Sequence, residues 1–279
     1  MGTVRVLLIG DVVGEPGMAA LEAGLSGLVS EYAADFIIVN GENAAGGFGL
    51  TEETLGRIIA AGADVVTSGN HVWEKRDVWP VLDAEERVLR PANYPPGVPG
   101  RGWVRRDKGG VAYLTANLQG REGMTPIDCP FRAADALLAE ADALCARSGD
   151  DLAKPLIFVD FHAESPQEKE ALAFYLDGRV CALVGTHTHV RTADERLLPG
   201  GTAYVTDLGM TGATGGVIGM DTGVSLERNR TQIPHRMEIA KGATAIRGVC
   251  VEADAATGRA ASIRRVEWLS DVAEDGSAS

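Results

Sequence analysis

Side chains that commonly bind metal ions follow five separate apolar segments of this sequence. They are Asp11 after Val4–Ile9, Glu42 and Asn43 after Phe36–Asn40, Asn70 and His71 after Val65–Thr67, His162 after Leu156–Phe161, and His187 and His189 after Val180–Gly185. The set includes four of the five histidines of the chain. In open α/β sheets, ligands bind beyond the carboxyl ends of the strands. If the five apolar segments are strands, these residues define one candidate site.

The chemistry of this set indicates bound cations. Ionised Asp11 and Glu42 can only accept hydrogen bonds, and crowding two partly buried carboxylates with imidazoles costs several kcal/mol unless a cation compensates. Carboxylate, imidazole and amide ligands together suit manganese, iron or zinc better than magnesium or calcium. About seven ligands exceed the needs of one tetrahedral ion, which favours two ions. On an extended segment His187 and His189 would face the same side, whereas a turn after Gly185 would direct them to two neighbouring ions.

Each of these residues has a simpler explanation when it is taken alone. Asp11 could cap a helix. Glu42 and Asn43 could stabilise a turn, and Asn70 could adopt a left-handed backbone conformation. His162 could be a buried histidine with its hydrogen bonds satisfied. Only their joint occurrence at the ends of apolar segments favours a metal site.

Three other features of the sequence are not assigned to chemistry. His235 is isolated in Ile-Pro-His-Arg and is interpreted as a residue without a catalytic role. The glycine-rich segment 41–49 has no Gly-Lys-Ser/Thr, which excludes a phosphate-binding P-loop. Ser68 follows Thr67 and lacks the first glycine of a nucleophile elbow, so we do not expect it to be a nucleophile.

The segments that must position the candidate site alternate between strands and helices. The apolar stripe from Met18 to Tyr32 predicts a helix, and so does Thr51 followed by two glutamates. Continuous apolar strands between such helices are typical of a sheet that is covered on at least one face. The sequence therefore predicts an α/β protein.

The second half of the chain repeats this alternation with further strands and helices. Helices are expected over Arg132–Arg147 and after Ser165, where Pro166 suits the first helical position and Glu168 can close a capping box. Strands are expected over 111–118, 203–206 and 243–253. The last of these indicates more antiparallel pairing in the second half.

Two long segments have no predicted helix or strand. Arg90–Gly102 is rich in proline and glycine, and Gly209–Gly223 contains six glycines. Long loops within compact domains are often functional. Because no change of composition follows either segment, we expect surface loops of one domain that spans residues 1–269, followed by a disordered tail over 270–279.

The composition describes a globular protein rather than a membrane or nucleic-acid-coating protein. The 279 residues are 45% hydrophobic and 23% charged, and the net charge of −13 repels nucleic-acid backbones and anionic membranes. No apolar run reaches the ~18 residues of a membrane span, and the first residues resemble a strand rather than an export signal. A cytoplasmic location is therefore expected. The four cysteines have no neighbour at metal or redox spacing, so we expect them to be reduced.

Several motifs that occur in order along the chain resemble those of one family. They are Gly10-Asp11-Val12-Val13-Gly14, Asn40-Gly41-Glu42-Asn43-Ala44-Ala45, Gly69-Asn70-His71, Asp160-Phe161-His162-Ala163-Glu164 and Gly185-Thr186-His187-Thr188-His189-Val190. Three further segments, at 90–93, 117–121 and 207–212, are also similar. The chain thus resembles, from about Val4 to Glu252, the YmdB-like branch of the calcineurin-like metallophosphoesterases. The Gly-Glu-Asn-Ala-Ala run is the feature specific to that branch.

The resemblance implies a four-layer α/β/β/α sandwich and a dinuclear metal-dependent phosphoric diester hydrolase. It implies that small cyclic nucleotides, the 2′,3′-cyclic type above all, are the substrates, and that the protein is a homo-oligomer. Iron or manganese are the expected ions, with zinc or magnesium as alternatives. By motif, Asp11, Asn43 and His189 would bind one ion, Asn70, His162 and His187 would bind the other, and Glu42 would bridge them. The wider superfamily has Asp-x-His at its first motif, so the Asn43 oxygen is expected to replace the missing imidazole.

The mechanism that this resemblance implies is metal-assisted hydrolysis. A metal-bridging hydroxide would attack phosphorus in line, and His71 would protonate the departing ribose oxygen. The resemblance favours loss of the 2′ oxygen and a 3′-phosphate product. Two other functions remain open, namely a general phosphomonoesterase and a regulatory protein that binds a phosphorylated ligand with little turnover. The acidic composition makes long nucleic acid an unfavourable substrate.

Overall fold

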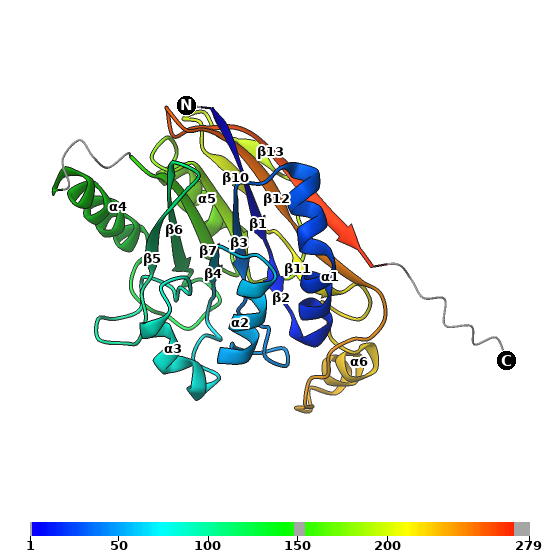
Figure 1. The fold of residues 1–279 in the computed structure, drawn as a ribbon. Helices are drawn as coiled ribbons and strands as arrows, with labels where there is room; N and C mark the ends of the chain where they lie inside the picture. The colour runs from blue at the N-terminus through cyan, green and yellow to red at the C-terminus, as the bar shows by residue number, and fades with distance from the viewer. Residues whose placement is uncertain (1, 148–153, 271–279) are drawn as a thin grey trace.

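The chain forms two β-sheets that face each other, with helices on both outer sides (Figure 1). The computed structural model describes residues 2–147 and 154–270. Apart from Ser270, the tail predicted to be disordered lies outside these residues. Within the described part, none of the helices is long and apolar enough to cross a membrane.

The first sheet combines the N-terminal strands with a C-terminal hairpin. Its members are β1 (Thr3–Ile9), β2 (Asp11–Val12), β3 (Phe36–Asn40), β4 (Val65–Thr67), β11 (Met210–Ala213), β12 (Thr244–Asp254) and β13 (Ala260–Leu269). They are arranged in the order β2-β11-β12-β1-β3-β4, with β13 paired to β12. The strands β1, β3 and β4 are parallel, whereas β12 runs antiparallel to both β1 and β13. The antiparallel pairing expected in the second half is thus concentrated on β12.

The second sheet comes entirely from the middle of the chain. Its members are β5 (Trp103–Lys108), β6 (Val111–Gln119), β7 (Leu156–His162), β8 (Ala182–Thr186), β9 (Arg196–Leu197) and β10 (Ala203–Val205). The order is β5-β6-β7-β8-β10-β9. The four central strands are parallel, and only the two edge strands are antiparallel to their neighbours.

Helices cover the outer face of each sheet. The helices are α1 (Gly14–Tyr32), α2 (Glu52–Ala60), α3 (Trp79–Ala84), α4 (Pro130–Arg147), α5 (Pro166–Tyr175) and α6 (Thr222–Thr231), with a 3₁₀ turn η1 (Arg76–Val78). One apolar core joins α1 and α2 to the first sheet, a second lies between the sheets, and a third joins α4 and α5 to the second sheet. The predicted α/β/β/α sandwich is therefore confirmed.

The continuous apolar strands of the sequence are explained by this layering. In β1, Leu7 and Ile9 lie in the core beneath α1, whereas Val6 and Leu8 lie in the core between the sheets. Successive side chains of a strand point to opposite faces. A strand that is covered on both faces therefore needs apolar residues at every position.

The two predicted helix starts occur at the expected residues, with one correction. Thr51 caps α2 through a hydroxyl that accepts from the Thr54 N–H at 3.1 Å. Ser165 likewise caps α5 by accepting from the Glu168 N–H at 3.2 Å. The predicted capping box at Glu168 is wrong, because its buried carboxylate accepts from the backbone N–H groups of residues 121 and 122 at 2.9 and 3.1 Å. These donors belong to the loop after β6. The carboxylate accepts from them instead of from the backbone N–H of Ser165.

The interpretation of Gly209–Gly223 as one surface loop is also wrong in part. Residues Met210–Ala213 form β11, which pairs with β2 on one side and β12 on the other. Asp221 caps α6 by accepting from the Val224 N–H at 3.0 Å. Pairing with β2 and β12 keeps the backbone of β11 extended, although the segment is rich in glycine. All four cysteines are free, and Cys181 and Cys250 are buried as expected.

Candidate metal centre

Residues from both sheets converge where their parallel strands end. The first sheet contributes residues that follow β1, β3 and β4, and the second contributes His162, the last residue of β7, and the residues that follow β8. Among the contacts between the sheets, His162 Nε2 lies 2.7 Å from Glu42 Oε2. Main-chain and side-chain contacts then link the remaining predicted ligands to this pair.

Four side chains direct potential ligand atoms to the same point. His162 Nε2 lies 3.0 Å from Asn70 Oδ1 and 3.0 Å from His187 Nδ1. Ligand atoms of Glu42, His162 and His187 all lie within 4.8 Å of one another. Ligands held about 2.1 Å from an ion at neighbouring octahedral positions are about 3.0 Å apart. The observed spacing therefore fits atoms that surround one ion.

A second group lies beside this cluster. Asn43 Nδ2 lies 3.2 Å from His189 Nε2, and a half-turn of the amide would place Oδ1 there instead. Asp11 Oδ2 accepts from the backbone N–H of His187 at 3.2 Å. Asp11 Oδ1 lies 3.7 Å from His162 Nδ1. Asp11 thus contacts both His162 and the backbone of His187.

Four buried oxygen atoms at this centre have no hydrogen-bond partner in the described part of the chain. They are Asp11 Oδ1, both carboxylate oxygens of Glu42, and Asn43 Oδ1. A buried polar atom without a partner costs roughly 1–3 kcal/mol, and more when it carries charge. Such atoms are rare and call for an explanation such as a bound ion. The residues present therefore fit a cation-binding centre.

Burial changes the protonation of these residues in the metal-free protein. Loss of hydration raises the pKa of Asp11 to about 8, and it raises the pKa of Glu42 to about 8 against the opposing effect of nearby His71. Burial lowers the pKa of His162, and burial together with the neighbouring His162 lowers the pKa of His187 to about 3. The imidazoles are thus held neutral, which is the form that binds metal.

A buried chain of hydrogen bonds fixes the orientation of His162. Thr186 Oγ1 donates to Asp160 Oδ1 at 2.7 Å and lies 3.0 Å from His162 Nδ1. The hydroxyl of Thr186 has one proton, which it already donates in the hydrogen bond to Asp160. His162 Nδ1 must therefore carry a proton and donate it to the Thr186 oxygen. His162 Nε2 is then unprotonated and faces Glu42. Asp160 is held by further donors from Asn40 and Thr67. It stands in one of the family motifs, but its supporting role was not predicted, because its partners lie on three other strands.

A buried ion pair holds the segment that carries His187 and His189. Lys169 Nζ donates to Asp207 Oδ2 at 2.8 Å, and both side chains are fully buried. The same carboxylate accepts from the N–H and the hydroxyl of Thr188. His187 and His189 have φ values of 101° and 64°, and such left-handed backbone costs about 1–3 kcal/mol per residue. Lys169 was missed, since a lysine on a helix predicts exposure.

His71 lies at the rim of the centre rather than within the ligand cluster. Its side chain is 27% exposed, and Nδ1 lies 3.1 Å from Glu74 Oε1. Its ring packs edge-on against Phe48, with centroids 5.0 Å apart. It is therefore accessible to solvent and close enough to Glu42 to lower the pKa of that carboxyl against the effect of burial.

Two residues next to the cluster have structural roles. A Cβ atom at Gly69 would lie 1.8 Å from Glu42 Oε2, so only glycine fits between Glu42 and His162. Ser68 is buried and its hydroxyl donates to the Leu89 carbonyl at 2.7 Å. This serine is thus engaged in the scaffold.

Comparisons with known proteins agree with this architecture. The family model described as YmdB-like protein matches residues 7–266. A Bacillus subtilis protein named 2′,3′-cyclic-nucleotide 2′-phosphodiesterase is 46% identical over 94% of this chain and 96% of its own length.

Two solved structures have the same fold over nearly the whole chain. A hypothetical protein of Thermus thermophilus is 41% identical, with a TM-score of 0.86 over 95% of this chain and 99% of its own. A structure described as a novel phosphatase of Mycoplasma pneumoniae is 30% identical, with a TM-score of 0.87 over 96% of this chain and 94% of its own.

Proposed function

This chain belongs to the YmdB-like family, and from that membership we propose that it is a metal-dependent phosphodiesterase of 2′,3′-cyclic nucleotides. The phosphodiesterase and phosphatase names of its relatives support a hydrolase of phosphate esters. The observation that carries the metal dependence is the group of buried, unpartnered oxygens next to neutral imidazoles.

In this proposal, two divalent ions are held by side chains from both sheets. Asp11, Asn43 and His189 would hold one ion, Asn70, His162 and His187 would hold the other, and Glu42 would be a ligand of both. Iron or manganese suit this donor set, and zinc or magnesium are alternatives. When bound, the ions activate water as a nucleophile and offset the charge of the phosphate oxygens.

His71 is the proposed proton donor to the leaving oxygen. Its place at the rim lets an imidazolium approach the ribose side of a bound cyclic phosphate. The new P–O bond comes from water, the bond from phosphorus to O2′ breaks, and the proton of His71 goes to O2′. The product is then the nucleoside 3′-phosphate, in keeping with the 2′-phosphodiesterase name of the Bacillus subtilis relative.

A substrate panel tests this function. Protein reconstituted with manganese or iron should hydrolyse 2′,3′-cyclic nucleotides faster than 4-nitrophenyl phosphate, and a chelator should abolish the reaction. A higher rate on the monoester would instead identify a general phosphomonoesterase. Metal binding with no turnover on any ester would favour a regulatory binding protein.

We predict that Thr186→Val weakens metal binding about 10- to 100-fold, the usual cost of removing an outer partner of a ligand. Valine keeps the shape of threonine but cannot accept from His162 Nδ1–H, so the tautomer with a free Nε2 loses its support. Titration with a competing metal indicator measures the affinity. Thr115→Val is the matched control, because this buried hydroxyl has no hydrogen-bond partner in the part of the chain described. Equal affinities of the two variants would exclude this role of Thr186.

We also predict that the metal-free protein loses stability as the pH rises. Asp11 and Glu42 keep their protons up to about pH 8 when folded, whereas their unfolded pKa values are 3.8 and 4.5. The folded state therefore binds more protons than the unfolded state, and the free energy of unfolding falls with pH across this window. Urea unfolding in a chelator between about pH 5 and pH 8 measures the slope. Glu42→Gln should reduce it, and an unchanged slope would contradict the assignment.

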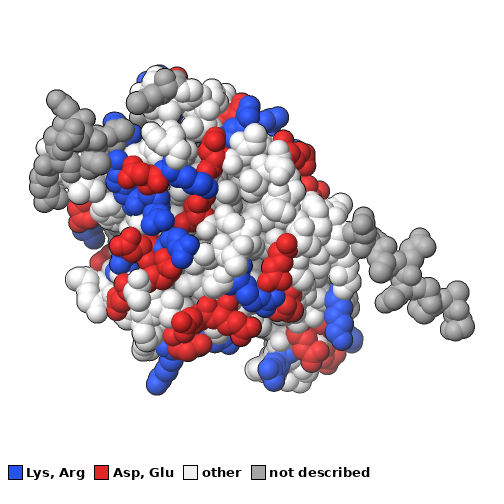
Figure 2. All heavy atoms as spheres, viewed as in Figure 1, with Lys and Arg blue, Asp and Glu red and all other residues white. Residues whose placement is uncertain are grey.

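The proposal also covers the size of the substrate, the location of the protein and its oligomeric state. Basic and acidic side chains are interspersed on the face in Figure 2, and acidic ones run along its lower part near α2 and α3. A surface of this kind favours a small nucleotide over long nucleic acid. We propose a cytoplasmic homo-oligomer, for which light scattering at micromolar concentration gives the oligomeric state.

A further inference from the structure

A cavity of about 540 Å³ lies next to His189, between α6 and the segments on either side of it. Ile218 lines this cavity, and its carbonyl lies 3.2 Å from His189 Nδ1. That contact makes Nδ1 the donor and leaves Nε2 for a metal ion. One hydrogen bond thus joins the cavity wall to the metal centre. The volume is within the range of small-molecule sites.

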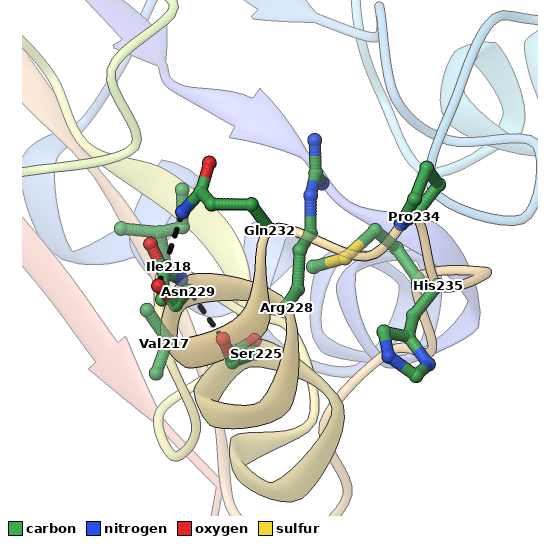
Figure 3. Close-up of a pocket in the computed structure, with 9 residues that line it drawn as sticks. Val217, Ile218, Ser225, Arg228, Asn229, Gln232, Pro234 and His235 are labelled. Carbon is green, nitrogen blue, oxygen red and sulfur yellow. Dashed lines mark hydrogen bonds between the residues drawn. The ribbon is translucent and has the colours of Figure 1, made fainter.

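The polar groups of the cavity offer donors and acceptors on different sides (Figure 3). Arg228 has no ion pair with any described residue. Asn229 Nδ2 donates to the Ser225 carbonyl at 2.9 Å and Gln232 Nε2 donates to the Asn229 carbonyl at 3.0 Å, which leaves both amide oxygens as acceptors. Ser225 is 2% exposed, and its hydroxyl has no partner among the described residues. The guanidinium and the two amide oxygens are thus available to a ligand in the cavity, whereas the Ser225 hydroxyl is buried.

The apolar side of the cavity is held in a strained conformation. Ile218 has a φ of 46°, which is rare for a β-branched residue, and its side chain is 52% exposed. Val217 and Met237 also line the cavity. Strain of this kind is typical of ligand-binding segments. The result is an apolar surface beside hydrogen-bonding groups, which suits a flat heterocycle.

We propose that this cavity binds the nucleobase of the substrate and prefers guanine to adenine. The inference rests on the proposed function, which places the phosphate at the adjoining metal centre. A guanidinium can donate two hydrogen bonds to O6 and N7 of guanine, and the free amide oxygens of Asn229 and Gln232 can accept from its remaining N–H groups. Adenine presents an N6 donor to Arg228 in place of O6. A bidentate pair of this kind discriminates between bases by about 5- to 150-fold.

Substrate ratios test this proposal. The wild type should have a kcat/KM for 2′,3′-cyclic GMP at least about 5-fold above that for 2′,3′-cyclic AMP. In Arg228→Met that preference should disappear, and the ratio of cyclic GMP to bis(4-nitrophenyl) phosphate turnover should fall about 10-fold. Arg230→Met is the matched control, since Arg230 lies on the same helix but does not line the cavity. Equal use of the two bases by the wild type, or equal ratios in the two variants, would overturn the proposal.

A binding measurement separates this inference from the proposed function. Guanosine has a base but no phosphate, so its binding to the chelated protein, followed by saturation-transfer NMR, needs neither metal nor hydrolysis. We expect guanosine to bind more tightly than adenosine, and Arg228→Met to remove the difference. Such binding without any esterase activity would retain the base site and refute the proposed reaction. Hydrolysis of cyclic nucleotides without a preference for guanosine would retain the proposed reaction and refute the base site.

Discussion

Glu42→Gln is expected to reduce phosphodiesterase turnover by more than about 100-fold. Loss of a residue that only hydrogen-bonds to a metal ligand typically costs about 10- to 100-fold. Both carboxylate oxygens of Glu42 are buried without a hydrogen-bond partner in the described residues, and Oε2 lies 2.7 Å from His162 Nε2. A glutamine keeps the shape of the side chain but replaces one charged oxygen by an N–H₂ group that cannot bind a cation. The variant should therefore lose both metal affinity and activity.

The fold of this variant should survive. Burial raises the pKa of Glu42 to about 8, so the metal-free protein at neutral pH already holds this side chain mostly uncharged. Urea unfolding of the chelated proteins should show Glu42→Gln to be as stable as the wild type or more stable. Glu52→Gln, an exposed change on α2, is the control and should retain wild-type turnover. Wild-type turnover in Glu42→Gln would exclude Glu42 from the centre.

The second large effect is expected for His71→Ala. Loss of a general acid costs about 10²- to 10⁴-fold in turnover. Because His71 is at the rim and outside the ligand cluster, bound metal per chain should stay at the wild-type level. Turnover of 2′,3′-cyclic nucleotides and elemental analysis of the same samples provide the two readouts.

The leaving group distinguishes proton donation from a positioning role of His71. A ribose oxygen is a strong base and needs a proton as it departs, whereas 4-nitrophenolate leaves without one. His71→Ala should therefore slow a cyclic nucleotide much more than bis(4-nitrophenyl) phosphate. An equal loss on both substrates would assign His71 to substrate binding, and near-normal rates on both would remove it from the mechanism.

The α/β class and many of the strands and helices could be predicted because they depend on local patterns. The strands β3 and β4 have the predicted bounds, since each is a short apolar run between turn residues. The four-layer arrangement came from the family resemblance and not from periodicity. The strands β2 and β11 were missed, because their pairing depends on partners distant in the chain. The strands β5, β9 and β13 were also missed, although each pairs with a strand adjacent to it in the chain.

The candidate site was accessible to sequence reasoning for a topological reason. Strand ends on parallel strands meet at one edge, so a polar residue directly after each apolar run is enough to suggest a cluster. The supporting residues give no such signal. Asp160 lies inside β7 and Lys169 inside α5, and each is explained only by buried partners on other elements. Those contacts join residues that are distant in the chain, so neither composition nor residue spacing predicts them.

The number of metal ions bound per chain tests the central claim most directly. Protein stripped with a chelator, reconstituted with manganese and freed of excess metal should contain about two equivalents by elemental analysis. Glu42→Gln prepared in the same way should contain fewer. At most one equivalent in the wild type would contradict a centre built by the loops of both sheets around a pair of ions.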